Sequence, residues 1–114
     1  MAKPKAGELK SIVQFERYTT VDDGFGKVEN WSSHGDPVRA RKTEVSDGER
    51  WRASEVGAVI TARFLLRWSV FTAGITAKDR LICEGRKYEI TGGPREVHGR
   101  RRYVELSCAA RSDK

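Results

Sequence analysis

The residue pairs and clusters that do catalytic chemistry are scarce in this sequence. The two histidines, His34 and His98, both fall in predicted turns, and no GxSxG segment surrounds a serine. Neither histidine has a Cys, His or carboxylate partner at a recognised metal-ligand spacing. We therefore predict no catalytic residue, no metal site and no cofactor, and we expect that the protein is not an enzyme.

Two glycine-containing segments lack the features of ligand-binding loops. Residues 22–26, Asp-Asp-Gly-Phe-Gly, lack the spaced carboxylates and the closing Glu of a calcium loop, and they are typical of a hairpin tip. Residues 92–94, Gly-Gly-Pro, lie between two predicted strands, and the proline has no N–H to donate to a phosphate. We predict that they break the preceding strand and bind no nucleotide.

The two cysteines, Cys83 and Cys108, each lie within an apolar run. They form neither a CxxC pair nor the cysteine framework of a secreted protein. The favoured interpretation is that both are buried free thiols that pack as small apolar side chains. A disulfide between them requires that their strands be neighbours.

A cluster of arginines gives the sequence its densest positive charge. The chain has a formal net charge of +6, and Arg95 lies shortly before the run Arg100, Arg101 and Arg102. Positive potential attracts polyanions. Consecutive residues on a strand point to opposite faces, so three arginines cannot all read one DNA groove. We predict contacts with phosphates or with acidic groups of a neighbouring subunit; simple solvation at the surface is the alternative.

Short alternating segments predict the elements that must position these residues. Residues 9–18, 28–31, 38–43, 58–70, 80–84, 86–91 and 102–108 read as strands. Ser46 and Glu49 form a capping box that predicts a helix over residues 47–55. Trp51 and residues 53–56 are expected to lay this helix over one opening of the sheet.

The strand pattern also separates a core from candidate contact loops. The residues in the apolar phase, which we expect to share one interior, are Val13, Phe15, Ile60, Phe64, Leu66, Ile90, Val104 and Leu106. Two loops are expected to be mobile in a free subunit and to order against partners, because they contain glycine and exposed aromatic residues. Their candidate contact residues are Asp22, Asp23, Gly24, Phe25, Gly26, Phe71, Gly74 and Lys78.

Length and composition indicate a single folded domain. The 114 residues are 38% apolar, and a second domain would leave too little chain for two cores. We predict a flexible N-terminal arm (1–8), one domain (9–109) and a flexible tail (110–114). The fold class is all-β: a small antiparallel β-barrel of about seven strands with one short helix and long loops. No apolar stretch approaches the roughly 20 residues of a membrane span, and the N-terminus lacks a secretory signal, which predicts a cytoplasmic protein.

Short sequence pieces, in order over residues 7–108, carry a resemblance to a known family. They are Gly7-Glu8-Leu9, Asp23-Gly24-Phe25-Gly26, Trp31, Val38-Arg39-Ala40, Gly48-Glu49, Ala53, residues 63–67, Gly74-Ile75-Thr76, Asp79-Arg80-Leu81, residues 85–90 and residues 100–108. The chain resembles the head-tail joining proteins of siphophage-type viruses and gene transfer agents, also called head-closure, stopper or head-tail adaptor proteins. Pro37 and Lys42 depart from the family pattern, which often has apolar residues there.

The resemblance implies a function as well as a fold. It implies a non-enzymatic β-barrel subunit that forms a six- or twelvefold ring between the portal or its adaptor and the tail-completion proteins. The ring would line the channel for double-stranded DNA, without sequence-specific contacts, and help to retain the genome. The protein would assemble in the host bacterial cytoplasm and remain in the virion, with no contact to a membrane.

A small basic nucleic-acid-binding β-barrel is the alternative. The net charge and the arginines favour it, and Tyr18, Phe25 and Trp31 are candidate platforms for stacked bases. Their alternating positions favour a packing role instead. A connector is expected to self-associate, whereas a DNA-binding barrel is expected to bind as a monomer with strong salt dependence.

Overall fold

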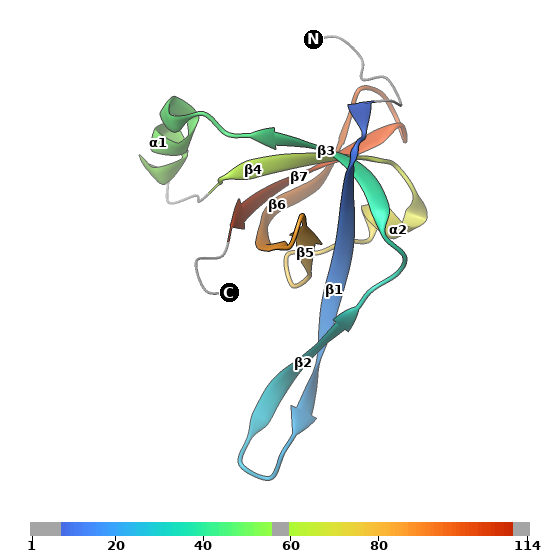
Figure 1. The fold of residues 1–114 in the computed structure, drawn as a ribbon, viewed down its shortest axis with the longest axis vertical. Coiled ribbons are helices and arrows are strands. Elements are labelled where there is room, and N and C mark those ends of the chain that lie inside the picture. Colours follow the sequence, from blue (N-terminus) through green and yellow to red (C-terminus); the bar gives the residue numbers. More distant parts are fainter. Residues whose placement is uncertain (1–7, 56–59, 111–114) are drawn as a thin grey trace.

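An antiparallel sheet of seven strands forms the framework of the computed structural model, which describes residues 8–55 and 60–110 (Figure 1). The strands are β1 (Ser11–Asp22), β2 (Lys27–Ser33), β3 (Val38–Glu44), β4 (Ala62–Arg67), β5 (Arg80–Cys83), β6 (Arg86–Val97) and β7 (Tyr103–Ala110). The helices in the described ranges are α1 (Asp47–Glu55) and α2 (Val70–Ala73). The predicted all-β class is confirmed, with one more short helix than expected.

The strand pairings close the sheet on itself. The order is β2-β1-β3-β4-β7-β6-β5, and β5 pairs in addition with β1. Six strands therefore form a closed ring of pairings, while β2 pairs with β1 alone. Closure removes the open edges of those six strands, which would otherwise present unpaired backbone groups.

One apolar core fills the interior of this ring. Phe64 and Leu66 alternate along β4 with outward residues, and both are completely buried. The predicted core residues found buried are Val13, Phe15, Phe64, Leu66, Ile90, Val104 and Leu106. Ile60 was predicted wrongly: it is half-buried and precedes β4, whose pairing with β3 reaches only Ala62.

Both cysteines belong to the same core. Cys83 and Cys108 are buried free thiols, as predicted. Burial raises the pKa of the Cys108 thiol to about 12, which keeps it protonated at neutral pH. Such a thiol packs as a small apolar group and is a poor nucleophile.

A second, smaller cluster covers part of the outer face of the sheet. Leu9, Leu65 and Tyr103 are buried together there, with Val97 against them. Tyr103 does point outward, as predicted from the phase of β7. It is nevertheless buried, because the segment before β1 folds over it.

The helix α1 begins and ends at the predicted residues. Its predicted position over one opening of the sheet is wrong. The Ser46 hydroxyl accepts a hydrogen bond from the Glu49 amide at 3.2 Å, as a helix cap should. No residue of α1 is buried, Trp51 is 62% exposed, and the helix projects to one side (Figure 1). Its sequence has no apolar stripe to pack on a sheet. Residues 56–59 lie outside the described residues.

Residues 92–94 bend a strand and do not end it. β6 continues to Val97, with shifts of register on either side of Gly92. Gly93 has a φ of +94°, and a Cβ there would lie 2.5 Å from the Glu105 carbonyl oxygen. Glycine therefore allows the close backbone approach of a β-bulge, where the sequence had suggested a break.

The segment 71–78 was also predicted wrongly as a loop with an exposed aromatic residue. Ser69 caps α2 through a reciprocal hydrogen-bond pair with Thr72. Phe71 is half-buried, with its ring 5.8 Å from that of Phe15 and 5.1 Å from that of His34. Because Thr72 and Ile75 are buried as well, this segment is fixed on the core.

Candidate assembly surface

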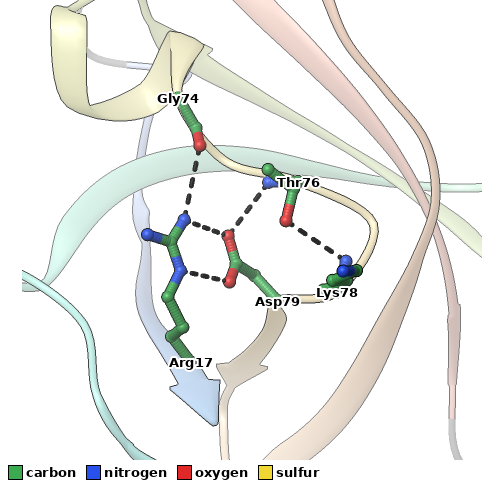
Figure 2. A network of polar contacts seen from close by, with 5 residues as sticks. All are labelled: Arg17, Gly74, Thr76, Lys78 and Asp79. Carbon is green, nitrogen blue, oxygen red and sulfur yellow. Dashed lines mark hydrogen bonds and ion pairs between the residues drawn. The ribbon is translucent and has the colours of Figure 1, made fainter. Parts of the chain in front are cut away.

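An ion pair between a partly exposed arginine and a buried aspartate closes the seam between β1 and the segment before β5 (Figure 2). Arg17 Nε donates to Asp79 Oδ1 at 2.7 Å, and Arg17 Nη2 donates to Asp79 Oδ2 at 2.8 Å. The Thr76 amide donates to Asp79 Oδ2 at 2.9 Å. The Asp79 side chain is completely buried, whereas the Arg17 side chain is 43% exposed. This bidentate pair connects residues 62 positions apart in the chain.

The pair holds Asp79 in its charged form. Burial acts to raise the pKa of the Asp79 carboxyl, but the hydrogen bonds from Arg17 and the Thr76 amide, with the charge of Arg17, outweigh it. The pKa of Asp79 therefore lies below its ordinary value. The same contact raises the pKa of Arg17. The pair is consequently ionised at every physiological pH.

A second ion pair lies one residue earlier on β1, and here β1 supplies the acidic partner instead of the basic one. Glu16 stands opposite Arg80 in the β1–β5 register, and Arg80 Nε donates to Glu16 Oε1 at 2.6 Å. The Arg80 guanidinium also lies over the Trp31 ring, 4.0 Å from its centroid. The Trp31 ring in turn packs on the Tyr18 ring, with 4.9 Å between their centroids. The residues that close the ring of strands therefore also brace the base of the β1–β2 hairpin.

Beyond this brace, β1 and β2 form an arm that projects from the body (Figure 1). The pairings of β1 with β3 and β5 end at Glu16, so residues 17–22 pair only with β2. We call residues 17–32 the hairpin arm. It accounts for the elongated shape, whose principal extents are 53 × 33 × 24 Å.

The tip of the hairpin arm, residues 22–26, carries the first group of predicted contact residues. Asp22 and Asp23 accept hydrogen bonds from the amides of Gly24 and Phe25, both at 2.9 Å. These short-range bonds fix the turn and leave the Phe25 side chain 99% exposed. Val21 and Val28 stand opposite one another just behind it and are nearly half exposed. The tip is thus an apolar projection flanked by carboxylates.

The second group of predicted contact residues is dispersed. Phe71 packs inward, and Gly74 caps the end of α2 and accepts from Arg17 through its carbonyl at 3.4 Å. Lys78 is exposed in the turn before Asp79, where its amide donates to the Thr76 hydroxyl at 3.2 Å. This segment therefore supports the hairpin arm through Arg17 and Asp79.

The predicted arginine cluster lies in a turn and not on a strand. Arg100, Arg101 and Arg102 connect β6 to β7, so the alternation expected of strand residues does not apply. The Arg101 amide donates to Glu96 Oε1 at 2.6 Å, and its guanidinium lies 5.3 Å from the Trp68 ring centroid. Arg95, on β6, forms an ion pair with Glu105, with 2.7 Å between Arg95 Nη2 and Glu105 Oε1. Within this predicted cluster, the exposed positive charge that has no acidic partner therefore lies in the turn.

Sequence reasoning missed the two ion pairs and the Trp31 contact. In the sequence, Asp79 and Arg80 stand out only as part of a short motif, and their partners lie on a strand far away in the sequence. Within residues 8–55 and 60–110, no three His, Cys, Asp or Glu side chains are grouped to hold a metal ion. No described helix is long and apolar enough to cross a membrane.

Comparison with known proteins supports the fold and supplies a family. The solution structure of a protein from Shigella flexneri 2a matches with a TM-score of 0.71 and 23% identity over 97% of this chain and 100% of that chain. At this identity the match shows a shared fold. No curated protein matches the sequence. The family model for the phage head completion protein matches residues 4–111, nearly the whole chain. The expected resemblance is confirmed, and the chain belongs to the phage head completion protein family.

Proposed function

We propose that this protein is a ring subunit at the head–tail junction of a tailed phage or gene transfer agent. Its family makes it a structural component of the virion with a head-tail connector role. In the proposal, six or twelve copies lie between the portal or its adaptor and the tail-completion proteins. The ring lines the DNA channel and retains the packaged genome, and it assembles in the cytoplasm of the host bacterium.

The hairpin arm is the observation that supports this proposal best. A fully exposed phenylalanine on a projecting hairpin leaves apolar surface in water in a free monomer, and a docking contact would bury that surface. The base of the arm is fixed by Arg80 and Trp31, so little conformational freedom is lost when the tip binds. The projecting α1, with Trp51 62% exposed, offers a second contact surface for a head or tail protein.

Particles made without the protein provide the test. We expect them to contain heads that lose DNA and tails that remain unjoined, and purified wild-type protein added to the extract should restore joined particles. A variant with Phe25 changed to Ser should restore far fewer, while the change of Val70 to Ser, at another exposed apolar side chain, serves as the control. Normal, joined, DNA-filled particles in the absence of the protein would refute the proposal.

The turn arginines are predicted to act in assembly or in channel electrostatics. Changing Arg100 and Arg102 to Ser should leave the free energy of unfolding within about 0.5 kcal/mol of wild type, because both side chains are exposed. The same variant should weaken ring formation or genome retention, and these should be salt-sensitive in the wild-type protein. Arg52 and Arg86, changed to Ser together, give a control with the same loss of exposed charge.

Two contacts weigh against the nucleic-acid-binding alternative. The Trp31 ring is covered by Arg80 and packed on Tyr18, so neither aromatic ring presents a free stacking platform. Phe25 lies beside Asp22 and Asp23, whose carboxylates repel phosphates. Preferential binding of one short duplex by the monomer, together with normal assembly of the arginine variant, would favour the alternative.

A further inference from the structure

An apolar pocket rimmed by arginines lies at the start of β1 and β3. It has a volume of about 530 Å³ and is lined by the apolar side chains Leu9, Val38, Leu66 and Trp68, with Arg39 and Arg67 at its edge. Both arginines are exposed. Among the described residues, neither has a carboxylate partner within ion-pair distance. We call this site the arginine-rimmed pocket.

The turn arginines extend the positive charge around this pocket. Trp68, one of its walls, has the Arg101 guanidinium over its ring and donates its amide to the Arg102 carbonyl at 3.0 Å. An occupant that combines an aromatic group with negative charge would satisfy both parts of such a site. Aromatic side chains carry much of the energy of protein interfaces, and arginines bind carboxylates in bidentate fashion.

The tip of the hairpin arm has the complementary chemistry. Phe25 is flanked by Asp22 and Asp23, each of which uses Oδ1 in the turn and leaves Oδ2 for an outside donor. Neither carboxylate has an ion-pair partner in the described part of the chain. A phenylalanine side chain is well within the size of the pocket. Charge and size therefore match between tip and pocket.

The tip of one molecule cannot reach the pocket of the same molecule. Extended backbone advances about 3.3 Å per residue, so the 12-residue strand β1 is roughly 40 Å long. The pocket lies at the first end of β1 and the tip at the other, as Figure 1 shows for the strand. A contact between them must join two molecules head to tail, and such a contact repeats into a ring when its rotation closes.

We propose that the hairpin tip of one copy docks in the arginine-rimmed pocket of the next, with Phe25 in the pocket and Asp22 and Asp23 on Arg39 and Arg67. This inference deepens the proposed function, on which it rests, because it names the two surfaces that build the ring. The occupant is a second copy of this chain, since the same chain carries both complementary surfaces at opposite ends.

Two full-length variants with separate defects test the contact. The tip variant combines Asp22→Asn, Asp23→Asn and Phe25→Ser; asparagine keeps the Oδ1 acceptors that hold the turn. The pocket variant combines Arg39→Glu and Arg67→Glu. Sedimentation velocity at rising concentration should show that wild-type protein associates beyond the dimer toward a closed ring. Each variant alone should associate at least tenfold more weakly.

A mixture of the two variants is the decisive sample. It retains one intact tip and one intact pocket, so it should form a 1:1 pair and nothing larger. A variant with Arg52→Glu and Arg86→Glu carries the same charge change at other exposed sites and should associate like wild type. Folding of every variant is checked by circular dichroism and thermal unfolding.

Three results would overturn the proposal. One is a mixture that associates no better than its components, and another is a tip variant that associates as wild type does. The third concerns the amide NMR signals of the pocket residues. The proposal is overturned if these signals change on deletion of residues 1–7 but do not change when protein with an intact hairpin tip is added. If wild-type rings form and the tip variant forms them equally, this contact is wrong while the proposed function stands. Absence of the wild-type protein from the head–tail junction of particles would instead contradict the proposed function.

Discussion

Replacing Arg17 with Met is expected to lower the free energy of unfolding by about 3 to 5 kcal/mol, because it leaves the Asp79 carboxylate buried without its partner. Methionine keeps most of the aliphatic stem, so the loss reports the charge and the hydrogen bonds. Asp79→Asn should cost less, about 1 to 3 kcal/mol, since the Arg17 guanidinium is already partly exposed and can regain water. Urea unfolding at pH 7 measures both values.

The dependence on pH separates this explanation from a general loss of packing. In wild-type protein the pKa of Asp79 is lowered, so its contribution is present above the ordinary carboxyl pKa of about 3.9 and is lost as the pH falls below it. In the Arg17→Met variant, burial without a cation should raise that pKa above its ordinary value. The stability gap between the two proteins should therefore narrow between pH 7 and pH 4, whereas a constant gap would contradict the ion-pair account.

Phe64→Ala should be the most damaging single change in the core, at about 3 to 5 kcal/mol. Phe64 is completely buried, and its ring packs edge-on against Tyr88 at 5.1 Å between centroids. Truncation removes buried apolar surface and leaves a cavity that the surrounding strands cannot fill. Urea unfolding at pH 7 measures this loss of free energy of unfolding.

Phe25→Ala is the matched control for this prediction. It deletes the same atoms from a side chain that is 99% exposed, so the free energy of unfolding should change by no more than about 0.5 kcal/mol. Equal effects of the two truncations would show that the interior and exterior faces of β4 have been assigned wrongly. Association of the subunits, in contrast, should suffer only from the change at Phe25.

Local patterns made much of the fold predictable. The alternation along residues 62–67 assigned Phe64 and Leu66 to the interior, and Ser46 with Glu49 located the start of α1. The hairpin at residues 84–85 follows from Gly85, since both turn residues have positive φ. Phe25 was predicted at an exposed tip because its neighbours Asp and Gly favour a turn, and it lies there.

The parts that sequence reasoning missed depend on pairing between distant segments. Nothing local indicates that Arg17 meets Asp79 or that Glu16 meets Arg80, because the β1–β5 pairing is set by closure of the whole sheet. α2 has only four residues, too short for an apolar period, and its cap uses Thr72 where the usual box has Glu or Gln. The arginine-rimmed pocket likewise gathers residues from β3, β4 and the segment before β1.

An image of the head–tail junction, obtained by electron cryomicroscopy of complete particles, tests the connector assignment most directly. We predict a ring of six or twelve copies of this fold between portal and tail, with each hairpin tip seated on the next subunit and the DNA channel at the centre. Copies that lie elsewhere in the particle, or a junction in which this chain is absent, would contradict that assignment.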